Sequence, residues 1–166
     1  MRIPTLDTPR LQLIGPDESH LDGYAAMYGD AESMQHIRGG QTFDRSGSWL
    51  KIATHVGHWQ LRGYGFWSVR EKASGEIVGQ AGLMYPADNP ALEIGWLVER
   101  RHWGKGYASE AAQAALDHAF QVVRAERVMA QIAPANTASR ALARKLGMRE
   151  DVERAAGGDF VYWAER

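Results

Sequence analysis

Alternating apolar and polar residues predict the β-strands of this chain. The run Arg10-Leu11-Gln12-Leu13-Ile14 alternates and predicts a first strand. Residues 65–70 and 76–83 predict two paired strands, because Lys72-Ala73-Ser74-Gly75 between them is a favourable hairpin turn. Further strands are predicted over 91–98, 127–132, 148–152 and 159–163.

Apolar residues spaced three to four positions apart predict four helices. The longest covers Gly106 to Val123, and its many alanines imply a backbone that packs close to the sheet. Its apolar stripe comprises Ala108, Ala112, Ala115, Leu116, Ala119, Phe120 and Val123, and its expected wet face comprises Ser109, Glu110, Gln113, Asp117, His118 and Gln121. The other helices are predicted from Asp17 or Ser19 to about Tyr28, and over 49–61 and 138–146. Residues 30–48 predict no clear element beyond a loop at Gly39-Gly40.

This order of elements indicates an α/β or α+β protein with a single layer of sheet. The 166 residues are most simply one domain, residues 1–166. A chain of this length buries roughly 70% of the surface that it exposes when unfolded. It therefore needs no disulfide or metal to support its core.

Composition narrows the class of protein. A net charge of −1 argues against a nucleic-acid or membrane-surface partner. No apolar run approaches the roughly 20 residues that cross a bilayer, and the first residues lack a signal-peptide pattern, so we expect a cytoplasmic protein. The chain has no cysteine, which excludes thiolate metal sites and a covalent cysteine intermediate.

The segment from Arg101 to Glu110 carries the strongest chemical signal. Its glycines, Gly104 and Gly106, lie between a predicted strand and a predicted helix, where free N–H groups and the helix dipole suit a phosphate. A P-loop needs four residues between its glycines, and a dinucleotide fingerprint needs a third glycine where this chain has Ser109. Both of these nucleotide motifs therefore fit poorly.

The preceding strand has two unlike faces. Leu92, Ile94, Trp96 and Val98 share one face and are expected in the core, whereas Ala91, Glu93, Gly95 and Leu97 share the other. A glutamate beside a glycine is unusual for a simple buried strand. Gly95 leaves room for a group that approaches closely.

Arg101, Gly104 and Gly106 fit the pattern R-x-x-G-x-G, which resembles the acetyl-CoA pyrophosphate loop of the GNAT superfamily of N-acetyltransferases. The later segment Asn136 to Met148 resembles the family's N-x-x-S motif, apolar helix and K-x-G. Thr8-Pro9-Arg10-Leu11, Gly79-Gln80-Ala81-Gly82-Leu83 and Glu93-Ile94-Gly95-Trp96 also match, so the likeness covers nearly the whole chain in order. The branch that it resembles most is that of the Rim-type ribosomal-protein N-terminal acetyltransferases.

The resemblance implies a mixed, mostly antiparallel sheet of six to seven strands with about four helices. It implies that the strand ending at Val98 separates from its neighbour and pairs with the pantetheine arm near Leu97 and Val98. It also implies that the pyrophosphate meets N–H groups of residues 103–109. The expected acetyl-CoA-binding residues are Leu97, Val98, Arg101, Trp103, Gly104, Lys105, Gly106, Tyr107, Ala108, Ser109, Asn136, Ser139 and Lys145.

Acetyl transfer requires a neutral amine, so a base helps, and Glu93 is the candidate, acting directly or through water. The alternative for Glu93 is a strand-end carboxylate paired with an arginine or lysine. An N–H near Val98 would stabilise the oxyanion. Many members of the superfamily place a tyrosine near the leaving thiolate, whereas this chain has Ala143, so Ser139 is the candidate there. Asn136 and Ser139 are also typical helix caps.

We therefore expect an enzyme that transfers acetyl from acetyl-CoA to an amine, directly in a ternary complex. The acceptor is a protein N-terminus or a small-molecule amine, and the alternative is a non-catalytic acyl-CoA-binding or sensor module on the same fold. No metal is expected, because His55 and His58 have no evident third ligand. Dimers are common in the family, so a homodimer is one possibility. The sequence itself shows no pattern that indicates an interface.

Overall fold

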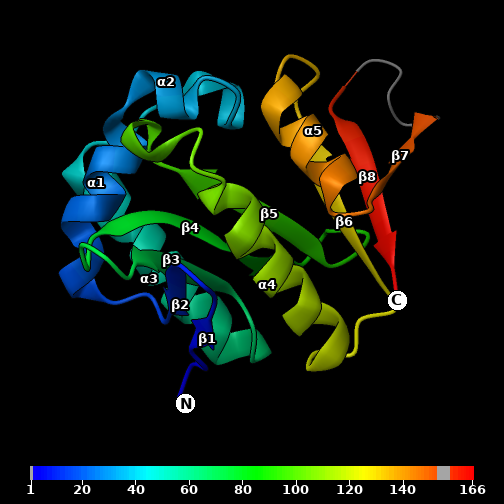
Figure 1. The fold of residues 1–166 in the computed structure, drawn as a ribbon, viewed down its shortest axis with the longest axis horizontal. Helices are drawn as coiled ribbons and strands as arrows, with labels where there is room; N and C mark the ends of the chain where they lie inside the picture. The colour runs from blue at the N-terminus through cyan, green and yellow to red at the C-terminus, as the bar shows by residue number, and fades with distance from the viewer. Residues whose placement is uncertain (1, 153–157) are drawn as a thin grey trace.

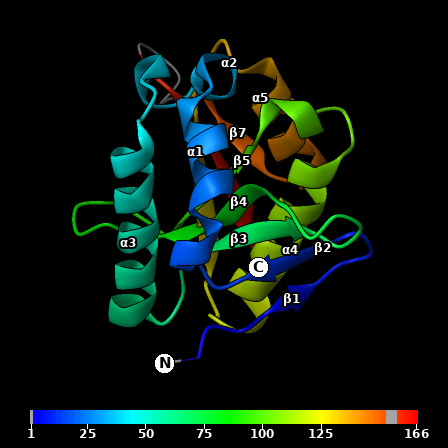
Figure 2. The same cartoon turned by 90° about the vertical axis from the view of Figure 1, so that its left-hand side faces the viewer.

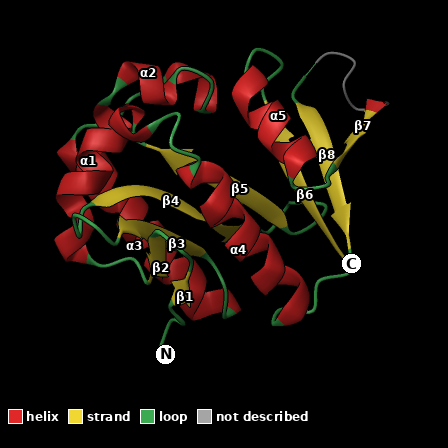
Figure 3. Cartoon of the chain, viewed as in Figure 1, coloured by secondary structure: helices red, strands yellow, loops and turns green. Residues whose placement is uncertain are grey.

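A computed structural model describes residues 2–152 and 158–166 of the chain. Within these residues the strands form one eight-stranded sheet in the order β1-β2-β3-β4-β5-β6-β8-β7 (Figures 1 and 3). All neighbours run antiparallel except the parallel pair β5 and β6. The strands are β1 (Leu6–Asp7), β2 (Leu11–Ile14), β3 (Phe66–Glu71), β4 (Ile77–Met84), β5 (Glu93–Val98), β6 (Arg127–Ile132), β7 (Arg149–Asp151) and β8 (Phe160–Glu165). The expected mixed sheet is confirmed, and the short β1 is its additional strand.

Helices cover both faces of this sheet. Helices α1 and α3 pack together on one face and α4 crosses the other, with α5 beside α4 over β6 (Figure 2). The described chain contains α1 (Leu21–Gly29), α2 (Ala31–Met34), α3 (Arg45–Arg62), α4 (Tyr107–Gln121) and α5 (Thr137–Lys145). Three short 3-10 helices are η1 (Glu18–His20), η2 (Arg38–Gly40) and η3 (Arg100–His102). Helix α2 is the one added to the four that the sequence predicts.

The core lies between the sheet and its helices, and two of its side chains differ from the sequence prediction. Leu92, Ile94 and Val98 are buried as predicted, but Trp96 is only half-buried at the edge of the core. His118, predicted on the wet face of α4, is buried, and its ring meets Trp67 edge-on at 5.0 Å. It lies three residues after Ala115, on the sheet-facing side of the helix. Burial lowers the pKa of His118, which favours the neutral ring in this position.

The strand that carries the candidate site is held closely by β4. Gly79 lies opposite Val98 in the antiparallel ladder. A Cβ atom at Gly79 would lie 2.5 Å from the Leu97 carbonyl oxygen, and Cβ atoms essentially never come so close to another heavy atom. Glycine at this position therefore allows β4 to support the end of β5 at close range.

No helix within the described residues combines the length and apolarity needed to cross a membrane.

Candidate functional site

A cavity of about 600 Å³ opens where β5 and β6 separate. The two strands are paired at one register position in the described sheet, Glu93 opposite Met129, and the Met129 N–H donates to the Leu92 carbonyl at 2.8 Å. Beyond this point the cavity is lined by the end of β5, the start of α4, α5, and α2 with the turn that follows it. The separation that the family resemblance implies is therefore present.

The free edge of β5 presents backbone groups to this cavity. Glu99 donates its N–H to the Val78 carbonyl on β4 at 2.9 Å. Because alternate residues of an antiparallel ladder face the partner strand, Leu97 also faces β4, whereas the N–H and C=O of Trp96 and Val98 point toward β6. The indole N–H of Trp103 donates to the Val98 carbonyl at 2.8 Å. The edge thus offers the peptide groups of Trp96 and Val98 for hydrogen bonds.

The N-terminus of α4 forms a second wall. Gly104 and Gly106 have φ angles of 75° and 80°, which other residues rarely adopt, and they turn the chain from η3 into the helix. No side chain caps this helix, whose first turn begins at Tyr107. Residues Trp103, Gly104, Gly106, Tyr107, Ala108 and Ser109 all line the cavity. The uncapped N–H groups of the first turn and the positive end of the dipole therefore favour an anion here.

Two cationic residues expected in this loop lie outside the cavity lining. The Arg101 guanidinium donates to both carboxylate oxygens of Glu99, at 2.7 and 2.9 Å. The Lys105 ammonium lies 3.2 Å from His102 Nδ1 and 4.0 Å from a Glu71 oxygen. The side chains of Arg101 and Lys105 therefore have partners outside the cavity, whose surface is formed here by other residues of the loop and the start of α4.

The opposite wall comes from α5. Asn136 caps this helix, because its side-chain oxygen accepts the Ser139 N–H at 3.1 Å. The hydroxyl of Ser139 accepts the indole N–H of Trp96 at 3.2 Å, which joins β5 to α5 across the separation. Asn136, Ser139 and Lys145 line the cavity, whereas Ala143, at the position of the family's tyrosine, is fully buried. An indole nitrogen only donates, so the hydroxyl hydrogen of Ser139 stays available to another acceptor.

Glu93 lies at the start of β5, where the two strands still meet. Burial raises the pKa of its carboxyl, a hydrogen bond from the Asn89 amide at 3.0 Å lowers it, and the Asp159 charge raises it, with a net upward shift. The expected alternative, an ion pair with arginine or lysine, is not found among the described residues. Glu93 does not line the cavity and lies three residues, roughly 10 Å, before Trp96 along the strand.

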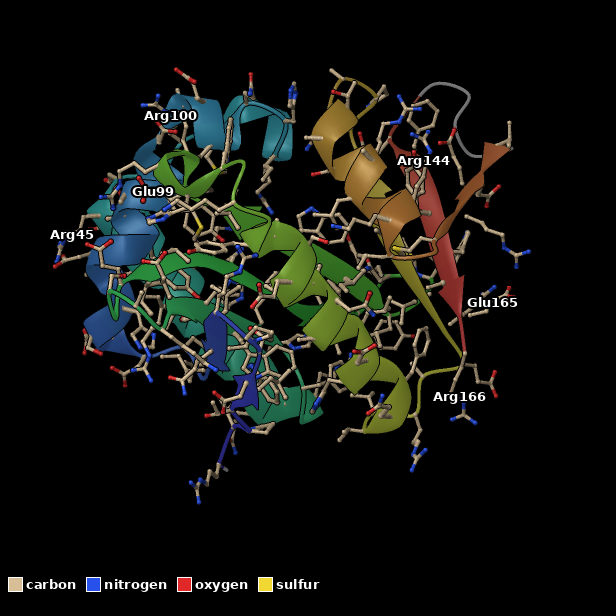
Figure 4. The ribbon with its side chains drawn as sticks, in the orientation of Figure 1. Arg45, Glu99, Arg100, Arg144, Glu165 and Arg166 are labelled. Carbon is tan, nitrogen blue, oxygen red and sulfur yellow. The ribbon has the colours of Figure 1, made fainter. Side chains whose placement is uncertain are left out.

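One cavity wall comes from the segment 30–48, in which the sequence predicts no clear element. It consists of Glu32, Ser33, Gln35, His36 and Ile37 from α2 and the following turn. Asp30 caps α2 through the Ser33 N–H at 2.8 Å. The Arg100 N–H donates to the Ser33 hydroxyl at 3.1 Å, and the Arg100 guanidinium lies 3.5 Å from Asp30 (Figure 4 labels Arg100 beside α2). The pattern Asp30-x-x-Ser33 is typical of a helix N-cap, and it is the feature of the sequence from which α2 could have been predicted.

Within the described residues, no group of three or more histidine, aspartate or glutamate side chains is arranged to hold a metal ion. His55 Nε2 lies 3.0 Å from Gln80 Oε1, and His58 lies between the Tyr64 carbonyl and the Tyr85 N–H. The two rings thus have separate partners.

Comparisons with known proteins agree with this geometry. The sequence profile of the acetyltransferase (GNAT) domain matches residues 10–149. YkkB, an uncharacterised protein of Bacillus subtilis (strain 168), is 33% identical over 132 residues, which cover 75% of this chain and 73% of YkkB.

Solved structures share the fold. An acetyltransferase from Agrobacterium tumefaciens str. C58 superposes with a TM-score of 0.88 at 28% identity, covering 100% of this chain and 96% of that one. RimL, a ribosomal L7/L12 alpha-N-protein acetyltransferase in complex with coenzyme A, superposes with a TM-score of 0.79 at 21% identity, covering 98% of each chain. Because the matching profile spans most of its length, this protein belongs to the GNAT acetyltransferase family and is an acetyl-CoA-dependent acyltransferase.

Proposed function

We propose that this enzyme is an N-acetyltransferase that passes acetyl from acetyl-CoA directly to a primary amine. The observation that carries the proposal is that the free edge of β5 and the uncapped start of α4 line the same cavity. A pantetheine arm carries amides and a diphosphate carries negative charge. The free edge of β5 can bind the amides, and the start of α4 can bind the diphosphate. One ligand lying along the cavity can therefore make both contacts.

The residues present fit acetyl-CoA. Trp96 and Val98 would hold the amide-bearing arm, and N–H groups of residues 103–109 would hold the diphosphate. The Val98 carbonyl accepts the Trp103 indole N–H and has a second lone pair with which it can accept a pantetheine amide. Leu97, Asn136, Ser139 and Lys145 would complete the walls, with Arg101 and Lys105 adding positive charge from outside.

The chemistry joins the amine nitrogen to the acetyl carbon and breaks the carbon–sulfur bond. Glu93 is the proposed acceptor of the amine proton, and its distance from Trp96 favours a water relay over direct contact. The free N–H of Trp96 or Val98 would stabilise the charge on the carbonyl oxygen. Ser139, held by Trp96, would donate its hydroxyl hydrogen bond to the departing thiolate.

Direct transfer is the proposed route, and the absence of cysteine from the sequence supports it by excluding an acetyl-cysteine intermediate. The acceptor class is a protein N-terminus or a small-molecule amine. An α-amino group has a pKa of roughly 7.7–8.0 against about 10.4 for lysine, so the first is more readily neutral near pH 7.

Calorimetric titration with acetyl-CoA and with CoA tests the binding half of the proposal, and we expect micromolar affinity for both. Thiol release from acetyl-CoA is then measured with a peptide bearing a free α-amino group, a polyamine, an amino acid and an amine-bearing antibiotic. At least one amine should raise release above the amine-free control. Binding without any amine-dependent release would favour the acyl-CoA-binding or sensor module. Absence of binding by both ligands would reject the cavity assignment.

A further inference from the structure

The segment before β2 packs against the outer side of the α4 N-terminus. One carboxylate oxygen of Glu110 accepts the Thr8 hydroxyl at 2.6 Å and the Arg10 N–H at 2.8 Å. The other oxygen accepts Arg10 Nε at 2.8 Å. The first turn of α4 is therefore tied to residues about a hundred positions earlier in the chain.

The same guanidinium also holds the glycine loop. Arg10 Nη1 donates to the Lys105 carbonyl at 2.7 Å. In a trans peptide the carbonyl and the following N–H point in opposite directions. Gly106 lines the cavity and Lys105 does not, so a Lys105 carbonyl held on the outer side directs the Gly106 N–H inward.

Arg10 also balances the charge at this point. Partial burial raises the pKa of Glu110, but the Thr8 and Arg10 hydrogen bonds outweigh burial and lower it, so the carboxylate is ionised. A bare carboxylate in the first turn of α4 would repel a phosphate nearby. The Arg10 charge offsets this repulsion, and its guanidinium also lies 4.8 Å from the centre of the Tyr107 ring.

We propose that Arg10 is a positioning residue for the acetyl-CoA diphosphate, bridging Glu110 and the Lys105 carbonyl so that the Gly106 N–H faces the ligand. The inference rests on the proposed function of the cavity. Lysine can supply the charge at this position, but one ammonium lacks the planar fork that reaches both acceptors. The bridge, rather than the charge alone, sets the orientation of the loop.

The test compares a ligand that carries the diphosphate with one that lacks it. Dissociation constants of CoA and of S-acetylpantetheine, which has no diphosphate, are measured by tryptophan fluorescence, since Trp96 and Trp103 line the cavity. Arg10→Met should weaken CoA binding about tenfold and leave S-acetylpantetheine binding unchanged. Arg10→Lys should also weaken CoA binding. Arg149→Met removes a more exposed ion pair away from the cavity, that with Glu165 at 3.1 Å, and should change neither constant.

Each outcome decides the inference. Equal weakening of both ligands would mean that Arg10 supports the fold in general, and unchanged CoA binding in Arg10→Met would also overturn the proposal. Wild-type affinity in Arg10→Lys would show that charge alone suffices and would overturn the bridge. Should Arg10→Met fail to fold, Arg10→Lys carries the comparison. If the wild-type protein binds neither ligand, the proposed function fails instead.

Discussion

Glu93 combines partial burial with one polar partner, the Asn89 amide. Its raised pKa keeps the carboxyl nearer to the range in which a base both accepts and returns protons. A surface glutamate would be ionised but weakly basic. The position at the start of β5 therefore makes this carboxyl more basic than an exposed glutamate, as the proposed role of base requires.

Glu93→Gln should lower the turnover number about tenfold to a hundredfold at neutral pH and leave acetyl-CoA affinity unchanged. Wild-type turnover should rise as pH passes through the raised pKa of Glu93, and the variant should lack this rise. The difference should shrink at high pH, where the amine is already neutral. Steady-state rates across pH and calorimetry with acetyl-CoA measure both parts, and an unchanged neutral-pH rate would remove Glu93 from the mechanism.

Thermal unfolding gives a second readout for the same variant. A carboxyl whose pKa is raised by folding supports the folded state at low pH, and this support is lost as pH rises through the folded pKa. Glu93→Gln should therefore melt at a higher temperature than wild type near pH 7. Glu126→Gln, on the exposed segment before β6, should alter neither turnover nor the pH profile.

At the scale of elements, the turn into α4 depends on left-handed backbone more than on space. A Cβ atom at Gly104 would meet nothing within 4 Å, yet the φ angle of this residue is 75°. Asparagine and aspartate tolerate this conformation better than other side chains and have nearly the same shape. They differ by one negative charge, so a comparison of the two variants separates the effect of the charge from the effect of backbone strain.

Gly104→Asp should weaken CoA binding at least tenfold, because a carboxylate would lie beside the phosphates at the helix N-terminus. Gly104→Asn is the matched control and should lose far less affinity. Calorimetry at low and high salt measures the difference, which should narrow as salt screens the added charge. Equal affinities of the two variants for CoA would place the phosphates elsewhere.

Long periodic elements were predictable, whereas two of the short elements were not. The strand Arg127–Ile132 matches its predicted bounds, and α4 is within two residues of its own. The two-residue β1 and the four-residue α2 are too short to show a period. Helix α3 begins four residues earlier than predicted because Asp44 caps it through the Gly47 N–H.

At the scale of the whole molecule, the family motifs indicated the loop at Gly104 but not the surroundings of each side chain. The pairing that turns Trp96 toward the cavity, and brings its indole to Ser139, depends on β4 and α5 together. The environment of Glu93 depends on Asn89 and on the distant Asp159. Except for Asn89, these partners lie far from Trp96 and Glu93 in the sequence, so no local pattern could predict the contacts.

The same long-range packing makes the molecule sensitive to acid. His55 stacks on Phe66 with ring centres 4.9 Å apart, and burial lowers its pKa to about 4. The unfolded chain binds this proton near pH 6.5, so stability is fully present above pH 6.5 and falls as pH decreases toward 4. The shift corresponds to about 3 kcal/mol, and the lowered pKa values of His20, His58 and His118 act in the same direction.

His55→Phe should therefore flatten the loss of stability between pH 6.5 and 4, measured by urea unfolding at a series of pH values. Its absolute stability at pH 7 will also change, because Gln80 loses a partner, so the slope is the quantity to compare. Tyr28→Phe is the matched control: Tyr28 lies in the same buried region, and burial raises its pKa far from the acid range. It should shift stability equally at every pH, and a wild-type slope in His55→Phe would assign the acid sensitivity to other groups.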